Sequence, residues 1–220
     1  YLFKVVRRVD SLRRLLAENP RVLEMRYSER EVVCEPASPP FAVRLDGVGF
    51  GSRLRDFPHP RSRLVHNALV EVARTIAQTY GADFAHVVSD EINLFFHRLA
   101  PYGGRTFKII SVLAGHASAE ATALLGRPLY FDGRVVKLRD LCDAATYFLF
   151  RARVGLNNYA VQIARGMGLL RERTPPIGEV VAKIKIDDYE LAWGAFLEKE
   201  RGYRKEVDVC NALSSLCNVC

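Results

Sequence analysis

Two acidic positions, each at the end of a mostly apolar segment, are the residues of this sequence best suited to chemistry. Asp46 follows the run 41–45, and Asp90 follows the run 84–89. Mg2+ prefers carboxylate oxygens, and two carboxylates on neighbouring strands are the usual protein contribution to a two-metal site that acts on phosphates. The pair therefore indicates metal-assisted phosphoryl chemistry. Taken singly each acid is weaker, because Asp-Gly is the commonest hairpin dipeptide and Asp90-Glu91 is typical of a solvated turn.

The segment that follows Asp46 has the composition of a phosphate-binding turn. It contains three glycines, which lack a Cβ and let a ligand approach the backbone closely. The backbone N–H groups of residues Val48–Gly51 are expected to form a nest for a triphosphate. The carbonyl oxygen of Gly47 is expected to be a further metal ligand.

Three cations are expected at the same edge of the structure. Arg44 precedes Asp46 on one segment, and Arg105 and Lys108 lie at the start of a predicted helix. Each can neutralise a phosphate through a charge-assisted hydrogen bond. For any one of them alone, an ordinary surface ion pair is the plainer interpretation.

The order of the apolar segments predicts the fold that positions these residues. Their periodicities give the order β-α-β-β-α-β, which is that of a polymerase-palm or ferredoxin-like antiparallel sheet with helices on one face, in an α+β protein. Asp90-Glu91 is expected at the bend of a tight hairpin, and Asp132-Gly133 at a turn. Because the first strand and the hairpin are neighbours in this topology, Asp46 and Asp90 should lie side by side. The strands are expected at 41–45, 84–89, 92–96 and 130–138, and the helices at 60–80 and 105–125.

The sequence divides into three predicted parts. Residues 1–40 comprise an N-terminal helix over 4–18 and a proline-rich connector, and residues 41–138 form a palm-like catalytic core. Residues 139–220 form a mostly helical part packed on the core. Its helices are expected at 139–168, 177–184 and 187–201.

The composition is that of a basic protein without a predicted membrane segment. Among 220 residues, Lys and Arg exceed Asp and Glu by 32 − 25 = 7, which is compatible with a nucleic-acid partner and also with a plain basic surface. No apolar run approaches the roughly 20 residues of a membrane-spanning helix. The first residues are too charged for a signal peptide. No membrane association and a cytoplasmic location are therefore expected.

Five cysteines leave their chemistry open. Cys210, Cys217 and Cys220 follow the pattern C-x6-C-x2-C, but structural zinc takes four ligands and no His lies nearby. A disulfide or free thiols fit this pattern better than zinc, and all three stay open.

Five motifs in a fixed order resemble those of the tRNA(His) guanylyltransferase family, and most of all those of its guanylyltransferase-like members, the 3′–5′ polymerases. The similarity covers residues 41–165, with a looser echo at 200–205. The motifs are RLDGVGF at 44–50, SDEINLFF at 89–96, KIIS at 108–111, FDGR at 131–134 and NN at 157–158.

The resemblance implies a palm-like domain with two Mg2+ ions held by Asp46, Asp90 and the carbonyl oxygen of Gly47, and with Glu91 as part of the acidic site. It also implies a bound incoming nucleotide and an activating nucleotide, GTP or ATP. The implied nucleotide-binding residues are Arg44, Asp46, Gly47, Val48, Gly49, Phe50, Gly51, Ser89, Asp90, Arg105, Lys108 and Ser111, of which Arg44, Arg105, Lys108 and Ser111 would serve the activating nucleotide.

The implied reaction lengthens a tRNA at its 5′ end. The 3′-hydroxyl of a nucleoside triphosphate attacks a 5′ end that was first activated with a nucleotide. The basic surplus would follow the RNA backbone, and the residues expected to contact tRNA are Arg151, Arg153, Asn157 and Asn158. The resemblance further implies a homotetramer.

Three departures from the family pattern bear on the substrate. The guanylyltransferases proper carry His-Ile-Asn-Asn followed by Leu-Tyr-Asn-Thr, whereas residues 155–162 here are GLNNYAVQ. Gly51 stands where those enzymes commonly have His. Their Lys-Pro-x-Asp segment is HPRS at 59–62, which leaves the triphosphate contacts there open, although Arg61 or Arg63 could substitute.

The departures point to the branch that repairs 5′-truncated tRNAs by templated addition. A tRNA(His)-specific guanylyltransferase is the alternative within the family. A nucleotidyl cyclase and a non-catalytic RNA-binding module of ferredoxin-like fold are the alternatives outside it. The sequence does not determine which tRNAs are substrates, which nucleotide activates the 5′ end, or whether addition needs a template.

Overall fold

The computed structural model describes residues 34–58, 60–170, 180 and 183–217. Contacts group Tyr1–Cys34 and Glu35–Cys220 into two separate compact units. The helix predicted over 4–18 and most of that predicted over 177–184 lie outside the described residues. The elements of the second unit are β1 (Phe41–Gly47), α3 (Phe50–Arg53), α4 (Arg63–Tyr80), β2 (Phe84–Val88), β3 (Glu91–Phe96), η1 (Pro101–Gly104), α5 (Thr106–Leu125), β4 (Phe131–Lys137), α6 (Leu141–Gly166), α8 (Tyr189–Trp193), β5 (Ala195–Glu198), η2 (Lys199–Arg201), β6 (Lys205–Glu206) and α9 (Val209–Leu213).

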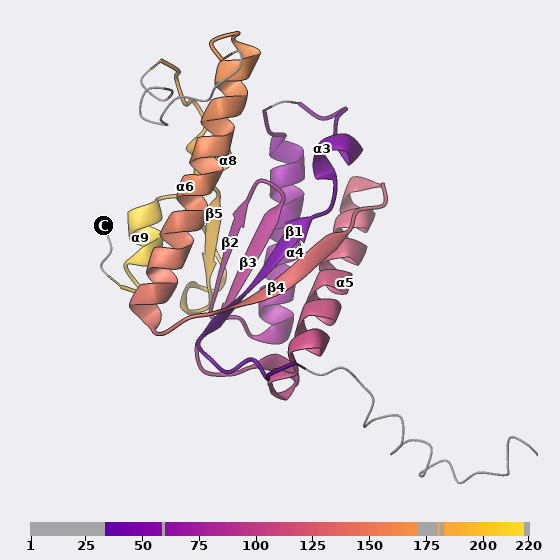
Figure 1. Ribbon diagram of the computed structural model, residues 1–220, viewed down its shortest axis with the longest axis vertical. Coiled ribbons are helices and arrows are strands. Elements are labelled where there is room, and N and C mark those ends of the chain that lie inside the picture. Colours follow the sequence, from indigo (N-terminus) through magenta and orange to yellow (C-terminus); the bar gives the residue numbers. More distant parts are fainter. Residues whose placement is uncertain (1–33, 59, 171–179, 181–182, 218–220) are drawn as a thin grey trace, which may run out of the picture. The chain divides into compact units, whose positions relative to one another are not determined.

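The strands form one antiparallel sheet in the order β4-β1-β3-β2-β5-β6 (Figure 1). The predicted order β-α-β-β-α-β is confirmed by β1, α4, β2, β3, α5 and β4. α4 begins at the N-cap Ser62, whose side chain accepts a hydrogen bond from the Val65 N–H, and ends at Gly81, which has φ of 73°. The predicted helix 60–80 and its glycine stop therefore match the structure closely.

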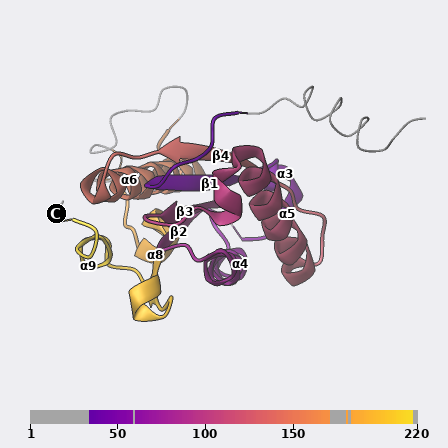
Figure 2. The same ribbon diagram turned by 90° about the horizontal axis from the view of Figure 1, so that it is seen from below.

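Helices cover both faces of the sheet. Apolar side chains of β1 and β3 that alternate with polar ones, such as Val43, Leu45 and Ile92, pack against α4 and α5 in one core. Phe84, Phe95 and Phe196 point to the other face and form a second core with α6 and α9. Figure 2 shows α4 and α5 on one side of the strands and α6 and α9 on the other. The polar positions of β1 and β3 thus lie on the face covered by α6.

Two predicted turns are placed differently in the structure. The hairpin bend is formed by Ser89 and Asp90, while Glu91 is the first residue of β3 and is buried. Ser89 has φ of 59°, the left-handed conformation that short hairpin loops demand. Asp132 and Gly133 lie within the continuous strand β4. A Cβ on Gly133 would approach Ile110 Cγ2 to 2.9 Å, so this glycine allows close packing of α5 rather than a turn.

The helix predicted over 187–201 is confirmed only over Tyr189–Trp193 and is wrong beyond it. α8 ends at Trp193, and the chain continues as β5, which pairs with β2. The three residues Ala195, Phe196 and Leu197 are almost fully buried. An apolar run this short fits a buried strand as well as a helix, and only the open edge of β2 decides between them.

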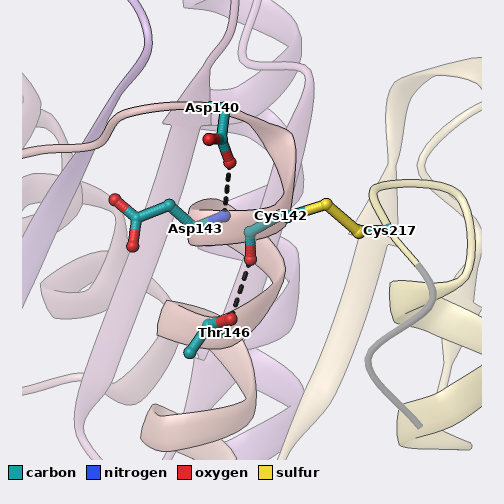
Figure 3. The surroundings of a disulfide bond; sticks show 5 residues. All are labelled: Asp140, Cys142, Asp143, Thr146 and Cys217. Carbon is teal, nitrogen blue, oxygen red and sulfur yellow. Dashed lines mark hydrogen bonds between the residues drawn. A yellow bond between two sulfur atoms is a disulfide. The ribbon is translucent and has the colours of Figure 1, made fainter.

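A disulfide joins Cys142, near the start of α6, to Cys217, in the segment that follows α9 in the chain (Figure 3). The two cysteines are 75 residues apart in sequence, and closing a loop of this length stabilises the folded state by about 4 kcal/mol in the chain-entropy model. Cys210 is disulfide-bonded as well. The disulfide alternative therefore holds for Cys217, and zinc at the three C-terminal cysteines is not supported. Within the described ranges, no helix is long and apolar enough to cross a membrane.

Gly155 lets α6 lie directly on β2. A Cβ at this position would come within 2.2 Å of Val88 Cγ2 and 3.0 Å of the Ala192 carbonyl oxygen. Both distances are shorter than or at the limit of normal contacts, so a side chain would push the helix away from the sheet. Gly155 is therefore required by the packing of α6 on β2 in this chain.

Gly155→Ala is expected to lower the free energy of unfolding by about 1–3 kcal/mol, because the added methyl overpacks a closed interface. Gly115→Ala is the matched control, since Gly115 is also inside a helix but has no neighbouring atom within 4 Å. It is expected to raise the free energy by about 0.5–1 kcal/mol through helix propensity. Urea unfolding of both variants measures the difference, and equal effects would contradict the packing role.

Two buried histidines, one on β2 and one on α4, connect these elements to α8. His86 is fully buried, and its Nε2 lies 2.8 Å from the carbonyl oxygen of Trp193. His66 of α4 has its Nε2 3.1 Å from Glu190 Oε1. Burial lowers the pKa of His66 and of His86 from 6.5 to about 4 in each case. Both rings are thus neutral at pH 7.

The free energy of unfolding is therefore expected to fall as the pH drops from 7 to 5. In this range the two histidines bind protons in the unfolded state but stay neutral in the folded state. The free energy of unfolding therefore falls by about 2 kcal/mol for each histidine. His86→Gln keeps a donor for the Trp193 carbonyl oxygen and is expected to remove about half of that loss. Chemical denaturation at several pH values measures it. An unchanged slope in the variant would contradict a neutral His86.

Candidate active site

The pairing of β1 with β3 brings three acidic residues to one edge of the sheet. Asp46 lies opposite Glu91 in the register, and the Gly47 N–H donates a 3.0 Å hydrogen bond to the Asp90 carbonyl oxygen. Asp46 and Asp90 are close enough for the charge of one to act on the other. The structure therefore brings together the two carboxylates that the sequence singles out.

Asp90 lies in an environment that disfavours its negative charge. Burial raises the pKa of the Asp90 carboxyl, and the Asp46 carboxylate raises it further, while the Ser89 hydrogen bond and the charge of Arg61 lower it. Among the described residues, no Lys or Arg forms an ion pair with Asp90. A bound cation between Asp46 and Asp90 would remove the repulsion.

The glycine-rich turn after Asp46 is fixed by packing as well as by backbone conformation. A Cβ on Gly47 would lie 2.6 Å from the ring of Phe50, so only glycine lets this ring fold back over the strand end. Gly49 has φ of 68° and precedes α3. Arg53 holds the turn from outside by donating to the carbonyl oxygens of Val48 and Pro128.

Fewer backbone amides of the predicted nest are free to bind a phosphate than the sequence suggests. The Val48 N–H donates to the Tyr130 carbonyl oxygen at 2.8 Å, so it is not available to a ligand. Within the described part of the chain, no protein acceptor faces the amides of Phe50 and Gly51. The turn can therefore present the backbone of residues 49–51.

A pocket of about 680 Å³ opens beside Ser89 and Asp90. One wall is apolar and comes from α3 and the loop before α4, while the opposite wall is polar and comes from α6. A volume of this size suits a nucleotide, with the base on the apolar wall and the sugar and phosphates on the polar wall. The lining residues are Phe50, Gly51, Leu54, Phe57, Pro58, Pro60, Arg61, Ser62, Val65, His66, Ser89, Asp90, Asn157, Asn158, Val161, Gln162 and Arg165.

Arg61 links the loop before α4 to α6 and to α8 through hydrogen bonds. Its guanidinium donates to the carbonyl oxygens of Leu191 at 2.6 Å, Ala192 at 3.1 Å and Gly155 at 3.1 Å. Burial lowers the pKa of Arg61 to about 10. Arg63 is instead paired with Asp188 and Glu190. Of the two arginines considered for the altered loop, only Arg61 lines the pocket.

Several pocket residues were not singled out from the sequence as site residues, among them Gln162, Arg165 and His66. Gln162 and Arg165 continue the helical face of Asn158 at spacings of four and seven, and that spacing was visible in the sequence once α6 was predicted. His66 carried no local pattern that separated it from a core histidine. Arg165 is exposed, and no ion pair engages it among the described residues.

The residues expected to contact tRNA lie at different depths of α6. Arg151 is turned inward and pairs with Glu91, and its side chain is only 12% exposed. Arg153 is exposed, and Asn157 and Asn158 line the pocket. Arg153 is thus the one of the two arginines that an RNA backbone can reach directly.

Arg105, Lys108 and Ser111 do not join the other predicted site residues. All three belong to the start of α5, which covers the opposite face of the sheet from Arg44 and Asp46. Thr106 beside them hydrogen-bonds the Glu35 carbonyl oxygen, near the start of β1 rather than its end. The expectation that Arg105 and Lys108 share the edge of Asp46 is wrong within one protomer. The two cations lie near the start of β1, whereas Asp46 lies near its end, and they are on the opposite face of the sheet.

The side chains present fit Mg2+ but not a protein-only metal cage. In the described ranges, no group of three His, Cys, Asp or Glu side chains could hold a metal ion. Mg2+ commonly takes one or two carboxylates and completes its shell with water and substrate phosphates. Asp46 and Asp90, with the unfavourable charge of Asp90, match that requirement.

Comparison with known proteins agrees with this geometry. The sequence model of the family described as tRNAHis guanylyltransferase matches residues 23–139, which is 139 − 22 = 117 of 220 residues. Comparison with curated proteins gives no significant match.

Solved structures show the same fold at low sequence identity. A bacterial tRNA(His) guanylyltransferase-like protein in complex with ATP is 21% identical, with a TM-score of 0.73 over 87% of this chain and 92% of that chain. One in complex with GTP is 20% identical, with a TM-score of 0.70 over 90% and 94%. The tRNA(His) guanylyltransferase of Saccharomyces cerevisiae is 16% identical, with a TM-score of 0.64 over 83% and 95%. This chain therefore belongs to the tRNAHis guanylyltransferase family, and it is a nucleotidyltransferase.

Proposed function

We propose that this protein is a Mg2+-dependent 3′–5′ nucleotidyltransferase that adds nucleotides to the 5′ end of tRNA and repairs 5′-truncated tRNAs against a template. The observation that carries the proposal is the convergence of Asp46 and Asp90 beside a nucleotide-sized pocket in a member of this family. Solved neighbours of the same fold are complexes with ATP and GTP, which supports a nucleotide as the occupant of the pocket.

Asp46, Asp90 and the Gly47 carbonyl oxygen would hold the two Mg2+ ions. When bound, such ions lower the pKa of an attacking hydroxyl and stabilise the charge on the transferred phosphate. The protein's own contribution is to keep the two carboxylates together in spite of their repulsion, with Asp90 partly buried at the pocket. Asp46 can accept a ligand because Arg44 engages one of its oxygens, Oδ2, at 2.7 Å.

The pocket would orient the incoming nucleoside triphosphate. Its apolar wall, with Phe50 and Phe57, suits a base, while Asn158, Gln162 and Arg165 suit the sugar and phosphates. In 3′–5′ addition the 3′-hydroxyl must lie at the carboxylates, so the triphosphate extends away from Asp90 along α6. Arg165 is well placed to receive it, because it is an exposed pocket cation without an ion-pair partner among the described residues.

The bond changes define what the site must do. The tRNA 5′-monophosphate first attacks the α-phosphate of ATP or GTP, which releases pyrophosphate and leaves a nucleotide joined to the 5′ end. The 3′-hydroxyl of the incoming nucleotide then attacks the tRNA 5′ phosphorus and loses its proton, a new phosphodiester forms, and a nucleoside monophosphate leaves. Both steps develop negative charge on phosphate oxygens, so both need cations near Asp46 and Asp90.

Templated repair is supported by the departures from the guanylyltransferase pattern. The His that the guanylyltransferases proper carry at this place would, at position 155, collide with Val88 and the Ala192 carbonyl, so this chain has no room for that signature. Gly51 has open space around it and also lacks the aromatic side chain common there. Addition of an extra G to tRNA(His) remains the second candidate on family grounds. A homotetramer and a cytoplasmic location remain predictions from the resemblance.

The direct test is incorporation of labelled GTP and ATP, with Mg2+, into a tRNA that lacks its first 5′ nucleotide. The base opposite the gap is C in one substrate and U in the other, and repair against a template predicts G in the first and A in the second. Asp46→Asn and Asp90→Asn are each expected to abolish incorporation. Asp187→Asn, whose exposed side chain pairs with Lys185 outside the pocket lining, is the matched control and is expected to retain it.

Three other results would redirect the proposal. Incorporation of G alone, and only into tRNA(His), would favour the guanylyltransferase alternative. Nucleotide turnover that does not respond to tRNA would favour a cyclase. Tight tRNA binding without any incorporation would indicate an RNA-binding module with an inactive site.

Arg165→Met is expected to raise the Kd for GTP about tenfold, because a charge-assisted hydrogen bond to phosphate is lost. Guanosine, which has no phosphate, should bind both proteins equally. Arg153→Met changes the other exposed arginine of α6 outside the pocket and is expected to leave GTP affinity unchanged. Calorimetry with GTP and guanosine separates these cases. An equal loss for both ligands would place Arg165 at the base or in the fold instead.

A further inference from the structure

A chain of alternating charges runs under α6 from the site edge into the protein. Asp46 Oδ2 pairs with Arg44 Nη2 at 2.7 Å, and Arg44 Nε lies 2.9 Å from Glu91 Oε2. Glu91 in turn receives Arg151 of α6, through Nε at 2.8 Å and through Nη2. Two acids and two arginines thus form a charge-neutral row on one face of the sheet.

Glu91 is held in place by this row and by its neighbours. Asn93 Nδ2 donates to Glu91 Oε1 at 2.7 Å, and the Tyr147 hydroxyl fixes Asn93 from α6 by donating to its Oδ1 at 2.6 Å. Three N–H groups, one of Asn93 and two of Arg151, therefore hydrogen-bond the two oxygens of Glu91. A carboxylate offers about four acceptor positions, and the position that remains, on Oε2, lies against Arg44 Nε at 2.9 Å, an ion-pair contact without a hydrogen bond. A metal ion at Glu91 would therefore have to displace the partly buried Arg44 side chain.

Asp46 and Asp90 differ from Glu91 in this respect. The Asp46 side chain is 31% exposed and meets one cation at one oxygen, while the Glu91 side chain is 6% exposed. Asp90 has no ion-pair partner in the described part of the chain, and it faces the pocket. The acceptor positions that a cation could use therefore belong to Asp46 and Asp90.

We propose that Glu91 is a positioning residue that acts as the buried counterion of Arg44 and Arg151 and is not a metal ligand. By neutralising Arg44, Glu91 prevents that arginine from competing with a divalent cation for Asp46. Arg151 then ties this balance to α6, the helix that also lines the pocket. The inference rests on the proposed metal site at Asp46 and Asp90, and it gives a role to Glu91, the third acidic residue at this edge.

Charge balance and direct ligation predict opposite behaviour in a double variant. Glu91→Gln leaves two arginines against Asp46 alone, so both hypotheses predict weaker binding of a divalent cation. Adding Arg151→Gln restores neutrality, and two amide side chains at these positions can hydrogen-bond each other. A counterion role predicts recovery of cation binding in the double variant, whereas loss of a ligand cannot be recovered in this way.

The experiment is Mn2+ binding to the full chain without nucleotide or RNA, measured by electron paramagnetic resonance of free Mn2+ and by calorimetry. Glu91→Gln is expected to raise the Kd for Mn2+ at least tenfold. The double variant with Arg151→Gln is expected to return within about threefold of wild type. Asp90→Asn should lose binding in either background. Thermal melts and circular dichroism of each variant verify the fold.

Glu91→Asp keeps the proposal testable if the amide variants fold poorly. The shorter acid retains the charge but withdraws its oxygens by one methylene, so a counterion keeps Mn2+ affinity within about threefold and a ligand loses it at least tenfold. Failure of the double variant to recover while folded, or a large loss in Glu91→Asp, would overturn the counterion role alone. Absence of Mn2+ binding by wild type would overturn it together with the metal site of the proposed function.

Discussion

The antiparallel register of β1 and β3 is the constraint on which the site depends. It sets Asp46 opposite Glu91, and through the turn it brings Asp90 against Gly47. Three acidic groups within one strand end repel each other, and burial in a medium of low polarity strengthens that repulsion. The sheet tolerates the arrangement because Arg44 and Arg151 neutralise two of the acids. The negative charge that remains is that of Asp90, next to the pocket.

The same face explains why α6 must approach the sheet so closely. Arg151 and Tyr147 reach Glu91 and Asn93 only if the helix lies on β2 and β3, and Gly155, one turn further along, removes the side chain that would prevent this. Arg61 then joins the Gly155 carbonyl to the end of α8. Packing, charge neutralisation and the pocket wall are therefore consequences of one helix position. A His at position 155 would disturb all three.

The sequence predicted the parts of this architecture that local patterns encode. The helical period and the glycine stop placed α4, and the order of segments placed Asp46 and Asp90 on neighbouring elements. What depends on contacts between distant segments was not predictable. Ala195–Leu197 became a strand because β2 offered an edge, and Gly133 served the packing of α5 instead of a turn.

Side-chain direction was the harder part of the site. Arg105 and Lys108 were expected at the edge of Asp46, yet a two-residue period along β1 and a helix on each face put them on opposite sides of the sheet. Arg151 and Arg153 look equivalent in sequence. Because a helix turns by about 100° per residue, side chains that are two residues apart point in nearly opposite directions. One therefore faces Glu91 and the other faces solvent.

Charge accounting links these observations to chemistry on phosphates. Arg44, Arg151 and Arg61 are all committed to protein oxygens, so they are poor partners for a phosphate that must enter and leave. Among the described residues, Arg165 on the polar wall is a pocket cation without an ion-pair partner, and the proposed metal at Asp46 and Asp90 would supply the other positive charge. A triphosphate needs compensation along its length, and the reacting phosphate needs it most in the transition state. A site with bound arginines at its base, and with Arg165 and the proposed metal at its surface, would meet both needs, because the bound arginines keep it folded whether or not the substrate is present.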